Sequence, residues 1–209
     1  MIEEQVILVD KNDNQIGLMP KMEAHEKALL HRAFSVFTFN EKGQLLLQQR
    51  ASDKYHSPLL WTNTCCSHQR NGETSLEAGK RRLQEEMGFT CDLEEVFSFI
   101  YKAPFDNGLT EHELDHVMVG RYNENPIINK DEVESFKWMT LEEVKDDIEN
   151  NPQIYVFMIK IKKCLELLHI EKRILMLHTD CLIQHGLMKK MLKYLVNVAI
   201  LIIMVIIMI

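Results

Sequence analysis

The stretch from residue 61 to residue 89 constrains the fold and chemistry of this chain more than any other segment. Within it, the adjacent Cys65 and Cys66 are followed by His68, and an Asn-Gly turn then leads into a segment of helical composition that ends at Gly88. A glycine directly after a periodic run is a typical helix stop. The stretch therefore predicts a turn that carries a thiol and an imidazole, followed by one well-defined helix.

The predicted helix carries a charged face. Arg82 and Glu86 are four positions apart, so their side chains lie on the same face of a helix. Taken alone, such a pair is an ordinary solvated ion pair. Beside a thiol and an imidazole, however, it indicates a site for a divalent metal ion and an anionic substrate.

Apolar runs on both sides of this stretch predict strands, and two further segments have helical composition. The second of these helices begins with T-L-E-E, a capping-box pattern. The predicted strands are residues 5–9, 16–19, 33–39, 44–49, 93–102, 110–122 and 134–139, and the flanking helices are residues 20–30 and 140–150. Strands mixed with helices in this way predict an α/β or α+β fold in which a sheet is sandwiched between helices.

Charge and cysteine content exclude several classes of protein. The formal net charge is −7, and the acidic residues are concentrated before residue 158, so nonspecific nucleic-acid binding is not expected. The five cysteines do not form the pattern of a secreted disulfide framework. The acidic N-terminus does not have the character of a signal peptide. We therefore expect a reducing, cytoplasmic setting.

The composition changes near residue 158. We expect one domain over residues 1–158 and an atypical tail over residues 159–209 that is rich in Leu, Ile, Met and Lys. The tail has three interpretations: the product of an out-of-frame or truncated gene, a membrane anchor, or a divergent terminal helix. The uncharged run at residues 195–209 is shorter than the about 20 residues that span a bilayer, so membrane association through residues 191–209 is possible but not favoured. We favour the first interpretation.

Five residues outside the helix form a candidate metal-binding set of imidazoles and carboxylates. They are His25, His31, His68, Glu111 and Glu113. A mixed nitrogen and oxygen set suits Mn, Zn or Mg, although each of these residues alone is more often an ordinary surface or packing residue. The first two histidines are six positions apart and do not share a helix face, so they converge only if the chain bends between them.

The segment from Glu73 to Phe89, with its E-E-x-G-apolar ending, resembles a Nudix box in which Arg82 replaces a glutamate used for metal-dependent hydrolysis. Together with T-N-T-C-C-S-H just upstream, A-H-E-K-A-L-L-H near the N-terminus and E-H-E at residue 111, it resembles the type I isopentenyl-diphosphate isomerases. The resemblance implies a Nudix-like mixed β-sheet. It also implies an enzyme of isoprenoid biosynthesis that interconverts isopentenyl and dimethylallyl diphosphate by metal-assisted protonation and deprotonation.

The resemblance assigns roles to individual residues. Cys66 and Glu113 would be the two acid/base groups, supported by Tyr101, whereas Cys65 would be a packing residue. A thiol suits this task because its pKa lies nearer neutrality than that of an alcohol. The five imidazole and carboxylate residues of the candidate set would all bind one Mn or Zn ion.

The resemblance also implies a site for the diphosphate. Four cations would hold it, and Glu86 would bind a Mg ion that travels with it; the cations are Lys21, Arg50, Lys54 and Arg82. A tryptophan that the family carries near its C-terminus is absent, and Met158 stands in its place.

Two rival functions remain open at this point. One is a Nudix hydrolase of a nucleoside or other diphosphate, and the other is a catalytically disabled Nudix-like protein that binds a ligand or is tethered to a membrane. A monomer and a homodimer are both compatible with the sequence.

Overall fold

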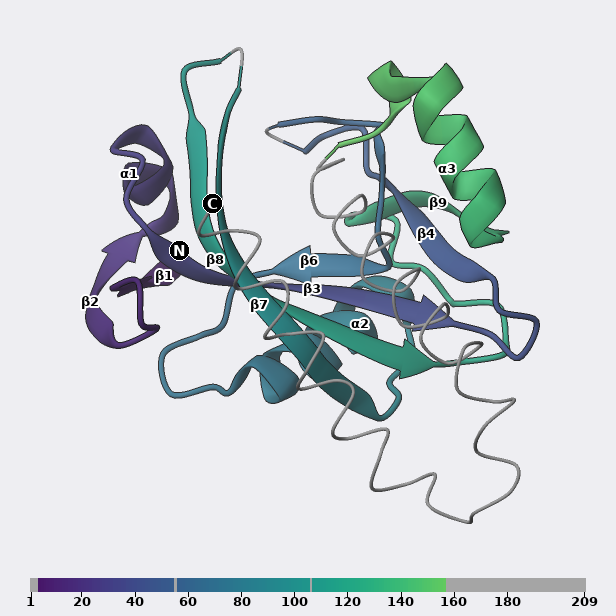
Figure 1. Ribbon diagram of the computed structural model, residues 1–209, viewed down its shortest axis with the longest axis horizontal. Coiled ribbons are helices and arrows are strands. Elements are labelled where there is room, and N and C mark those ends of the chain that lie inside the picture. The colour runs from purple at the N-terminus through teal and green to yellow at the C-terminus, as the bar shows by residue number, and fades with distance from the viewer. Residues whose placement is uncertain (1–3, 55, 106, 157–209) are drawn as a thin grey trace, which may run out of the picture. The chain divides into compact units, whose positions relative to one another are not determined.

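The computed structural model describes residues 4–54, 56–105 and 107–156 (Figure 1). The atypical tail and the position of Met158, with the three interpretations given above, lie outside the described residues. Within the described ranges, none of the helices combines the length and the apolar character that crossing a membrane requires.

The described elements follow the predicted order closely. They are β1 (Gln5–Val9), β2 (Gln15–Pro20), α1 (Lys21–Glu26), β3 (His31–Phe39), β4 (Leu45–Arg50), β5 (Trp61–Thr62), β6 (Cys65–Ser67), α2 (Ser75–Met87), β7 (Leu93–Pro104), β8 (Thr110–Arg121), β9 (Val133–Met139), α3 (Leu141–Asn150) and a 3₁₀ turn (Pro152–Ile154). Every predicted strand is present, and β5 and β6 were not predicted. The first predicted helix, residues 20–30, is wrong at its C-terminal end, because α1 stops at Glu26 and His31 already belongs to a strand.

The described strands form one mixed sheet with β3 near its centre (Figure 1). On one edge β3 runs parallel to β8, which pairs antiparallel with β7. On the other edge β3 pairs antiparallel with β1, β6 and β4, and β9 lies beside β4. The register places His31 opposite Glu113 and Ser35 opposite Cys66. The mixed α+β sheet expected from the sequence is therefore confirmed, and β3 connects its two halves.

Helix α2 packs on one face of the sheet and begins and ends where its sequence signals predict. Thr74 is its N-cap and forms a capping box with Glu77. Gly88 ends it with a φ of 72°, and a Cβ at this position would lie 2.2 Å from the carbonyl oxygen of Ile127, so only glycine is tolerated there. These signals set the two ends of the helix.

The apolar core lies between α2 and the sheet. Leu83 and Met87 of α2 are fully buried in one cluster with Phe34, Cys65 and Met118 from three different strands. Because successive residues of a strand point to opposite faces, placing Cys65 in this core directs the next residue to the other face. The sequence-based expectation that Cys65 is a packing residue is confirmed.

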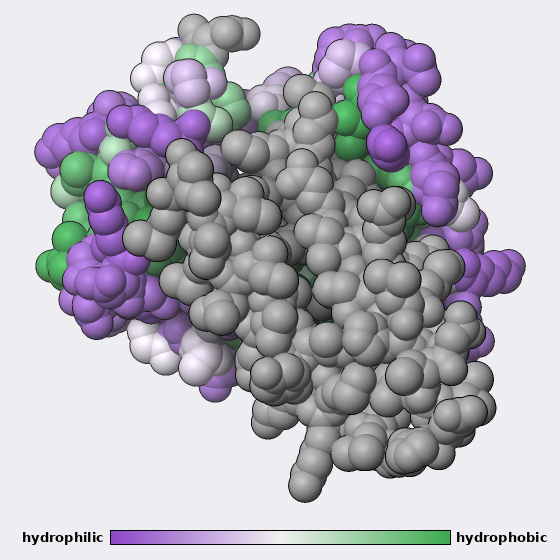
Figure 2. All heavy atoms as spheres, in the orientation of Figure 1, coloured by the Kyte–Doolittle hydropathy of each residue, from purple (hydrophilic) through white to green (hydrophobic). Residues whose placement is uncertain are grey.

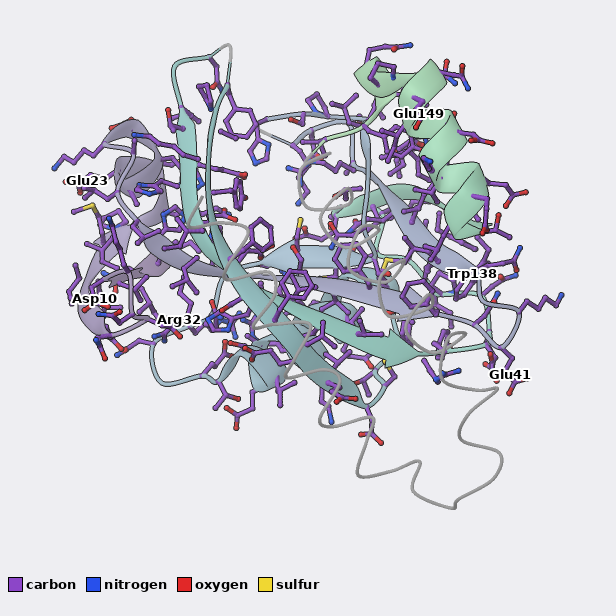
Figure 3. All side chains as sticks on the ribbon, in the orientation of Figure 1. Asp10, Glu23, Arg32, Glu41, Trp138 and Glu149 are labelled. Atoms are coloured by element: carbon purple, nitrogen blue, oxygen red, sulfur yellow. The ribbon has the colours of Figure 1, made fainter. Side chains whose placement is uncertain are left out.

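The shorter helices lie at the two ends of the sheet. Helix α1 follows the β1–β2 hairpin, and α3, which has its own capping box at Thr140, follows β9 (Figure 1). Hydrophilic side chains cover the outer surface of α3 (Figure 2). At the opposite end Arg32, labelled in Figure 3, donates a hydrogen bond from Nε to Oδ1 of Asp13 at 2.7 Å, which ties the turn of the β1–β2 hairpin to β3.

Candidate active site

Four of the five predicted metal-binding residues converge in space. One ligand atom from each lies within 4.8 Å of the others, and all four side chains are buried; the residues are His25, His31, His68 and Glu113. They come from α1, the first residue of β3, the residue after β6, and β8. Segments far apart in the sequence thus build one compact nitrogen and oxygen donor set.

A sharp turn after α1 brings the first two histidines together. Ala28 adopts a φ of 51°, which is uncommon for a residue other than glycine, and the amide of Leu29 donates to the carbonyl of Ala24 at 3.0 Å. The chain then enters β3 in a new direction. The ring centroids of His25 and His31 are consequently only 4.9 Å apart, so the bend that the sequence required is confirmed.

The rings of His25 and His31 are oriented so that one nitrogen of each can bind a cation. Nδ1 of His25 lies 2.7 Å from the carbonyl oxygen of Lys21, and Nδ1 of His31 lies 2.8 Å from that of Leu29, so each ring donates to the backbone through Nδ1. Their Nε2 atoms are buried with no hydrogen-bond partner among the described residues. A histidine held through one nitrogen with the other nitrogen unused is the usual arrangement of a metal ligand. The residues present therefore fit a divalent metal ion.

Burial keeps two of these imidazoles neutral, which is the form that binds metals. The pKa of His31 is lowered to about 3, first by burial and then by the charge of His68. Burial likewise lowers the pKa of His68, against the opposing hydrogen bond with Glu113, whose Oε1 lies 3.3 Å from Nε2. At neutral pH both rings are available without first losing a proton.

Tyr101 links the fifth predicted ligand to this group. Its buried hydroxyl lies 2.7 Å from Oε2 of Glu111 and also within hydrogen-bond distance of Glu113. Burial and the charge of Glu113 raise the pKa of Tyr101 well above its usual value, so the hydroxyl keeps its proton and donates it. Glu111, Glu113 and Asp115 alternate along β8 and share one face, as the two-residue period of a strand requires.

Cys66 and Glu113 lie on the same face of the sheet, on strands at opposite edges of β3. Cys66 is half-buried and stands opposite Ser35 across the β6–β3 pair. Ser35 donates from Oγ to Oδ2 of Asp115 at 2.9 Å, across the β3–β8 pair. Asp115 is two positions from Glu113 on β8, so all four side chains belong to the face away from α2. The arrangement leaves a thiol and a carboxylate on either side of one central strand.

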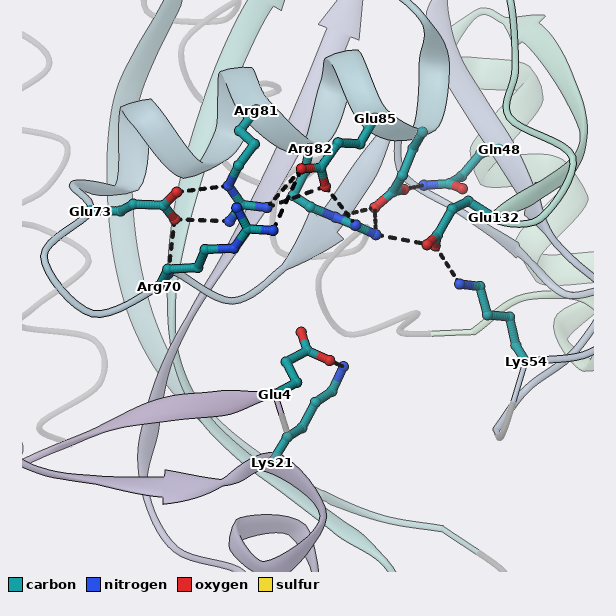
Figure 4. Close-up of polar contacts among 11 residues, drawn as sticks. Glu4, Lys21, Gln48, Lys54, Arg70, Glu73, Arg81, Arg82, Glu85 and Glu132 are labelled. Atoms are coloured by element: carbon teal, nitrogen blue, oxygen red, sulfur yellow. Dashed lines mark hydrogen bonds and ion pairs between the residues drawn. The ribbon is translucent and has the colours of Figure 1, made fainter. Parts of the chain in front are cut away.

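Two of the four predicted substrate-binding cations meet on a single carboxylate (Figure 4). Arg82 donates to Oε2 of Glu85 at 2.8 Å, to Oε1 of Glu86 at 2.9 Å and to Oε2 of Glu132 at 3.1 Å. Lys54 forms an ion pair with the same oxygen of Glu132. The loop carrying Lys54 and helix α2 are thereby joined through one acidic residue.

The other two cations have separate partners. Lys21 pairs with Glu4 at 3.2 Å (Figure 4), and Nη2 of Arg50 donates to the carbonyl oxygen of His56 at 3.2 Å. The His56 ring is buried and stacks on Phe105 in the β7–β8 connection, with centroids 5.0 Å apart. Burial and the positive charge of Arg50 lower the pKa of His56 to about 3. The positive charges of Arg50 and Lys21 therefore both oppose protonation of His56.

Sequence reasoning missed several polar residues of this region. They are Ser35, Gln48, His56 and Glu132. For two of them a signal was present, because Ser35 and Gln48 interrupt apolar strand runs, and a polar residue in such a run is buried and hydrogen-bonded. His56 and Glu132 stand in loops or turns and carry no periodic signal.

Comparisons with known proteins identify the family and the fold. Residues 29–158 match the NUDIX domain family. The isopentenyl-diphosphate Delta-isomerase 2 of Aromatoleum aromaticum is 49% identical over 165 residues, covering 79% of this chain and 86% of the relative. The protein of the same description from Photorhabdus laumondii is 52% identical over 159 residues, covering 76% and 90%. The crystal structure of DR0079 from Deinococcus radiodurans shares the fold, with a TM-score of 0.59, 24% identity, and coverage of 71% of this chain and 90% of that one.

Proposed function

We propose that this chain, which belongs to the NUDIX domain family, interconverts isopentenyl diphosphate and dimethylallyl diphosphate. The observation that carries the proposal is the position of Cys66 and Glu113 on one face of the sheet, at opposite edges of β3. Their backbones are separated by two strand spacings of about 4.8 Å across the sheet and by an offset of four residues along β3, from His31 to Ser35. A short alkenyl chain can lie between two such groups and meet one on each side.

The reaction moves a double bond, which requires one proton to be added to the substrate and one to be removed. One group adds a proton to an alkene carbon, and the other removes a proton from a carbon on the far side of the double bond. An alkene is a very weak base, so the acid has to be held close to it and shielded from water. Cys66 and Glu113 take these two roles, and the Tyr101 hydroxyl holds the Glu113 carboxylate in place.

A metal ion fits the buried donor set. The residues that would hold Mn or Zn are His25, His31, His68, Glu111 and Glu113. When bound, the ion supplies positive charge that orients the Glu113 carboxylate and offsets the burial of several acidic groups in one place. Glu86 would bind a Mg ion that the diphosphate carries.

The diphosphate would be held by four cations, three of which pair with carboxylates in this structure. Lys21 pairs with Glu4, whereas Lys54 and Arg82 pair with Glu132. Arg50 completes the set from the end of β4. A doubly or triply charged diphosphate competes well for these groups, because guanidinium and ammonium donors bind phosphate oxygens strongly.

A Nudix hydrolase would also bind a diphosphate, so reaction products have to separate the two activities. The test is incubation of the purified full-length chain with isopentenyl diphosphate, Mn and Mg in deuterated water. We expect dimethylallyl diphosphate that carries solvent deuterium, with no release of phosphate. Phosphate release without isomerisation would establish the hydrolase instead. Neither product, with metal still bound, would establish a disabled binding protein.

The setting of the protein remains the one expected from its sequence. Cys65 and Cys91 are free thiols, which agrees with a cytoplasmic protein. A monomer and a homodimer both remain compatible with the proposal.

A further inference from the structure

Gln48 connects two parts of the proposed site that lie apart in the sequence. It lies on β4 beneath α2, and only 3% of the residue is exposed. Its Nε2 atom donates to Oε2 of Glu86 at 2.9 Å and to the carbonyl oxygen of Thr64 at 3.0 Å (Figure 4 shows Gln48 beside the end of α2). A side-chain amide has two N–H protons, so this contact pair uses both.

The Thr64 end of this bridge is held by two further hydrogen bonds. Thr64 donates from Oγ1 to the carbonyl oxygen of Leu46 at 2.7 Å and accepts from the amide of Thr38 at 2.8 Å. Both partners belong to neighbouring strands of the sheet. Two residues later the same segment carries Cys66. Gln48 is therefore anchored to the backbone that positions the thiol.

The Glu86 end of the bridge is a buried carboxylate with both oxygens engaged. Only 4% of Glu86 is exposed, its Oε1 lies 2.9 Å from Nε and 2.5 Å from Nη2 of Arg82, and its Oε2 accepts from Gln48. A carboxylate has about four lone-pair positions, so the contacts with Arg82 and Gln48 fix its plane while a lone pair remains for a metal ion. Charge-assisted hydrogen bonds of this kind hold a metal-binding carboxylate in one orientation.

We propose that Gln48 is a positioning residue. It holds the Glu86 carboxylate in the orientation that binds the magnesium ion of the diphosphate, and it links Glu86 to the segment bearing Cys66. The inference rests on the proposed function, because it concerns the same diphosphate site. A purely structural role for Gln48 would affect the stability of the fold and leave the affinity for magnesium and diphosphate unchanged.

The test compares Gln48→Met, which keeps the size of the side chain and removes the amide, with Gln49→Met as a matched control. Gln49 is the next residue of β4, faces the opposite side, and donates to the carbonyl oxygen of Leu59 at 2.9 Å. The readout is calorimetric binding of inorganic pyrophosphate in the presence of Mg to the full-length chain preloaded with Mn. We expect Gln48→Met to weaken binding by about 10- to 100-fold and to leave Mn content unchanged. We expect Gln49→Met to bind like the wild type.

Further variants separate the possible outcomes. If Gln48 acts through Glu86, then adding Gln48→Met to Glu86→Gln causes no further loss of affinity. Gln48→Asn, which keeps the amide but shortens it by one methylene, shows the same weakening and replaces Gln48→Met if that variant does not fold. Wild-type affinity in either folded Gln48 variant overturns the inference. No binding by the wild type itself refutes the proposed diphosphate site, and the inference falls with it.

Discussion

Replacement of Tyr101 by phenylalanine removes one hydroxyl from the centre of the site. That hydroxyl lies within hydrogen-bond distance of both Glu111 and Glu113, and the residue is 5% exposed. Phenylalanine preserves the ring and its packing, so the change removes a hydrogen bond without opening a cavity. The variant therefore isolates the contribution of the donor to the orientation of the proposed acid/base carboxylate.

The expected loss of kcat follows from the number of protons that the Tyr101 side chain can donate. Tyr101 has a single O–H, so it donates fully to only one of the two carboxylates at a time. A hydrogen bond to a charged group contributes about 1.5–3 kcal/mol. If that contribution is expressed in the transition state, kcat falls by about 10- to 150-fold, since about 1.36 kcal/mol corresponds to a factor of ten. If Tyr101 donated two independent hydrogen bonds, the expected fall in kcat would be the square of this factor.

The assay is isomerase turnover of Tyr101→Phe at saturating substrate, with Mn content measured on the same sample. Tyr122→Phe is the matched control, because its ring stacks on Phe89 with centroids 3.7 Å apart, next to the core beneath α2. We expect the control to keep wild-type kcat. A Tyr101→Phe variant that retains Mn and turns over within twofold of the wild type would refute the role assigned to the hydroxyl.

Three further outcomes are expected. Leu83→Ala, at a fully buried position of α2, should lower the free energy of unfolding in urea by about 2–5 kcal/mol. Burial lowers the pKa of His116, but Glu95 and Asp13 outweigh burial and raise that pKa above 6.5. The protonated ring therefore stabilises the folded protein fully below pH 6.5, and this stabilisation is lost as pH rises through the folded-state pKa. His116→Gln should therefore flatten the decline of stability measured by urea titrations at pH values above 6.5. Mn at one hundred times its Kd should raise the free energy of unfolding of the metal-free wild type by about 2.7 kcal/mol, and His31→Gln should abolish this gain in thermal melts.

Features governed by local signals were predictable from the sequence. Helix α2 has a capping threonine at its start and Gly88 at its end, and both act through the backbone of a few residues. The longer strands show clear apolar runs. By contrast, β5 and β6 contain only two and three residues, which is too short for any period to be visible.

Features governed by distant contacts were not predictable. The convergence of His25 and His31 depends on Ala28 adopting a left-handed conformation that its residue type does not favour. The meeting of Lys54 and Arg82 on Glu132 joins segments that are remote in the sequence. Such contacts are set by packing of the whole domain, so residue types and spacing identify candidates without showing their partners.

The proton chemistry is tested most directly by the turnover of Cys66→Ala in deuterated water, with Cys65→Ala as the matched control. The two cysteines are adjacent, but Cys65 lies in the core beneath α2 and Cys66 lies on the opposite face. We expect Cys66→Ala to bind Mg and pyrophosphate normally and to incorporate no deuterium into product, whereas Cys65→Ala retains turnover. Wild-type turnover by Cys66→Ala would contradict the proposed mechanism.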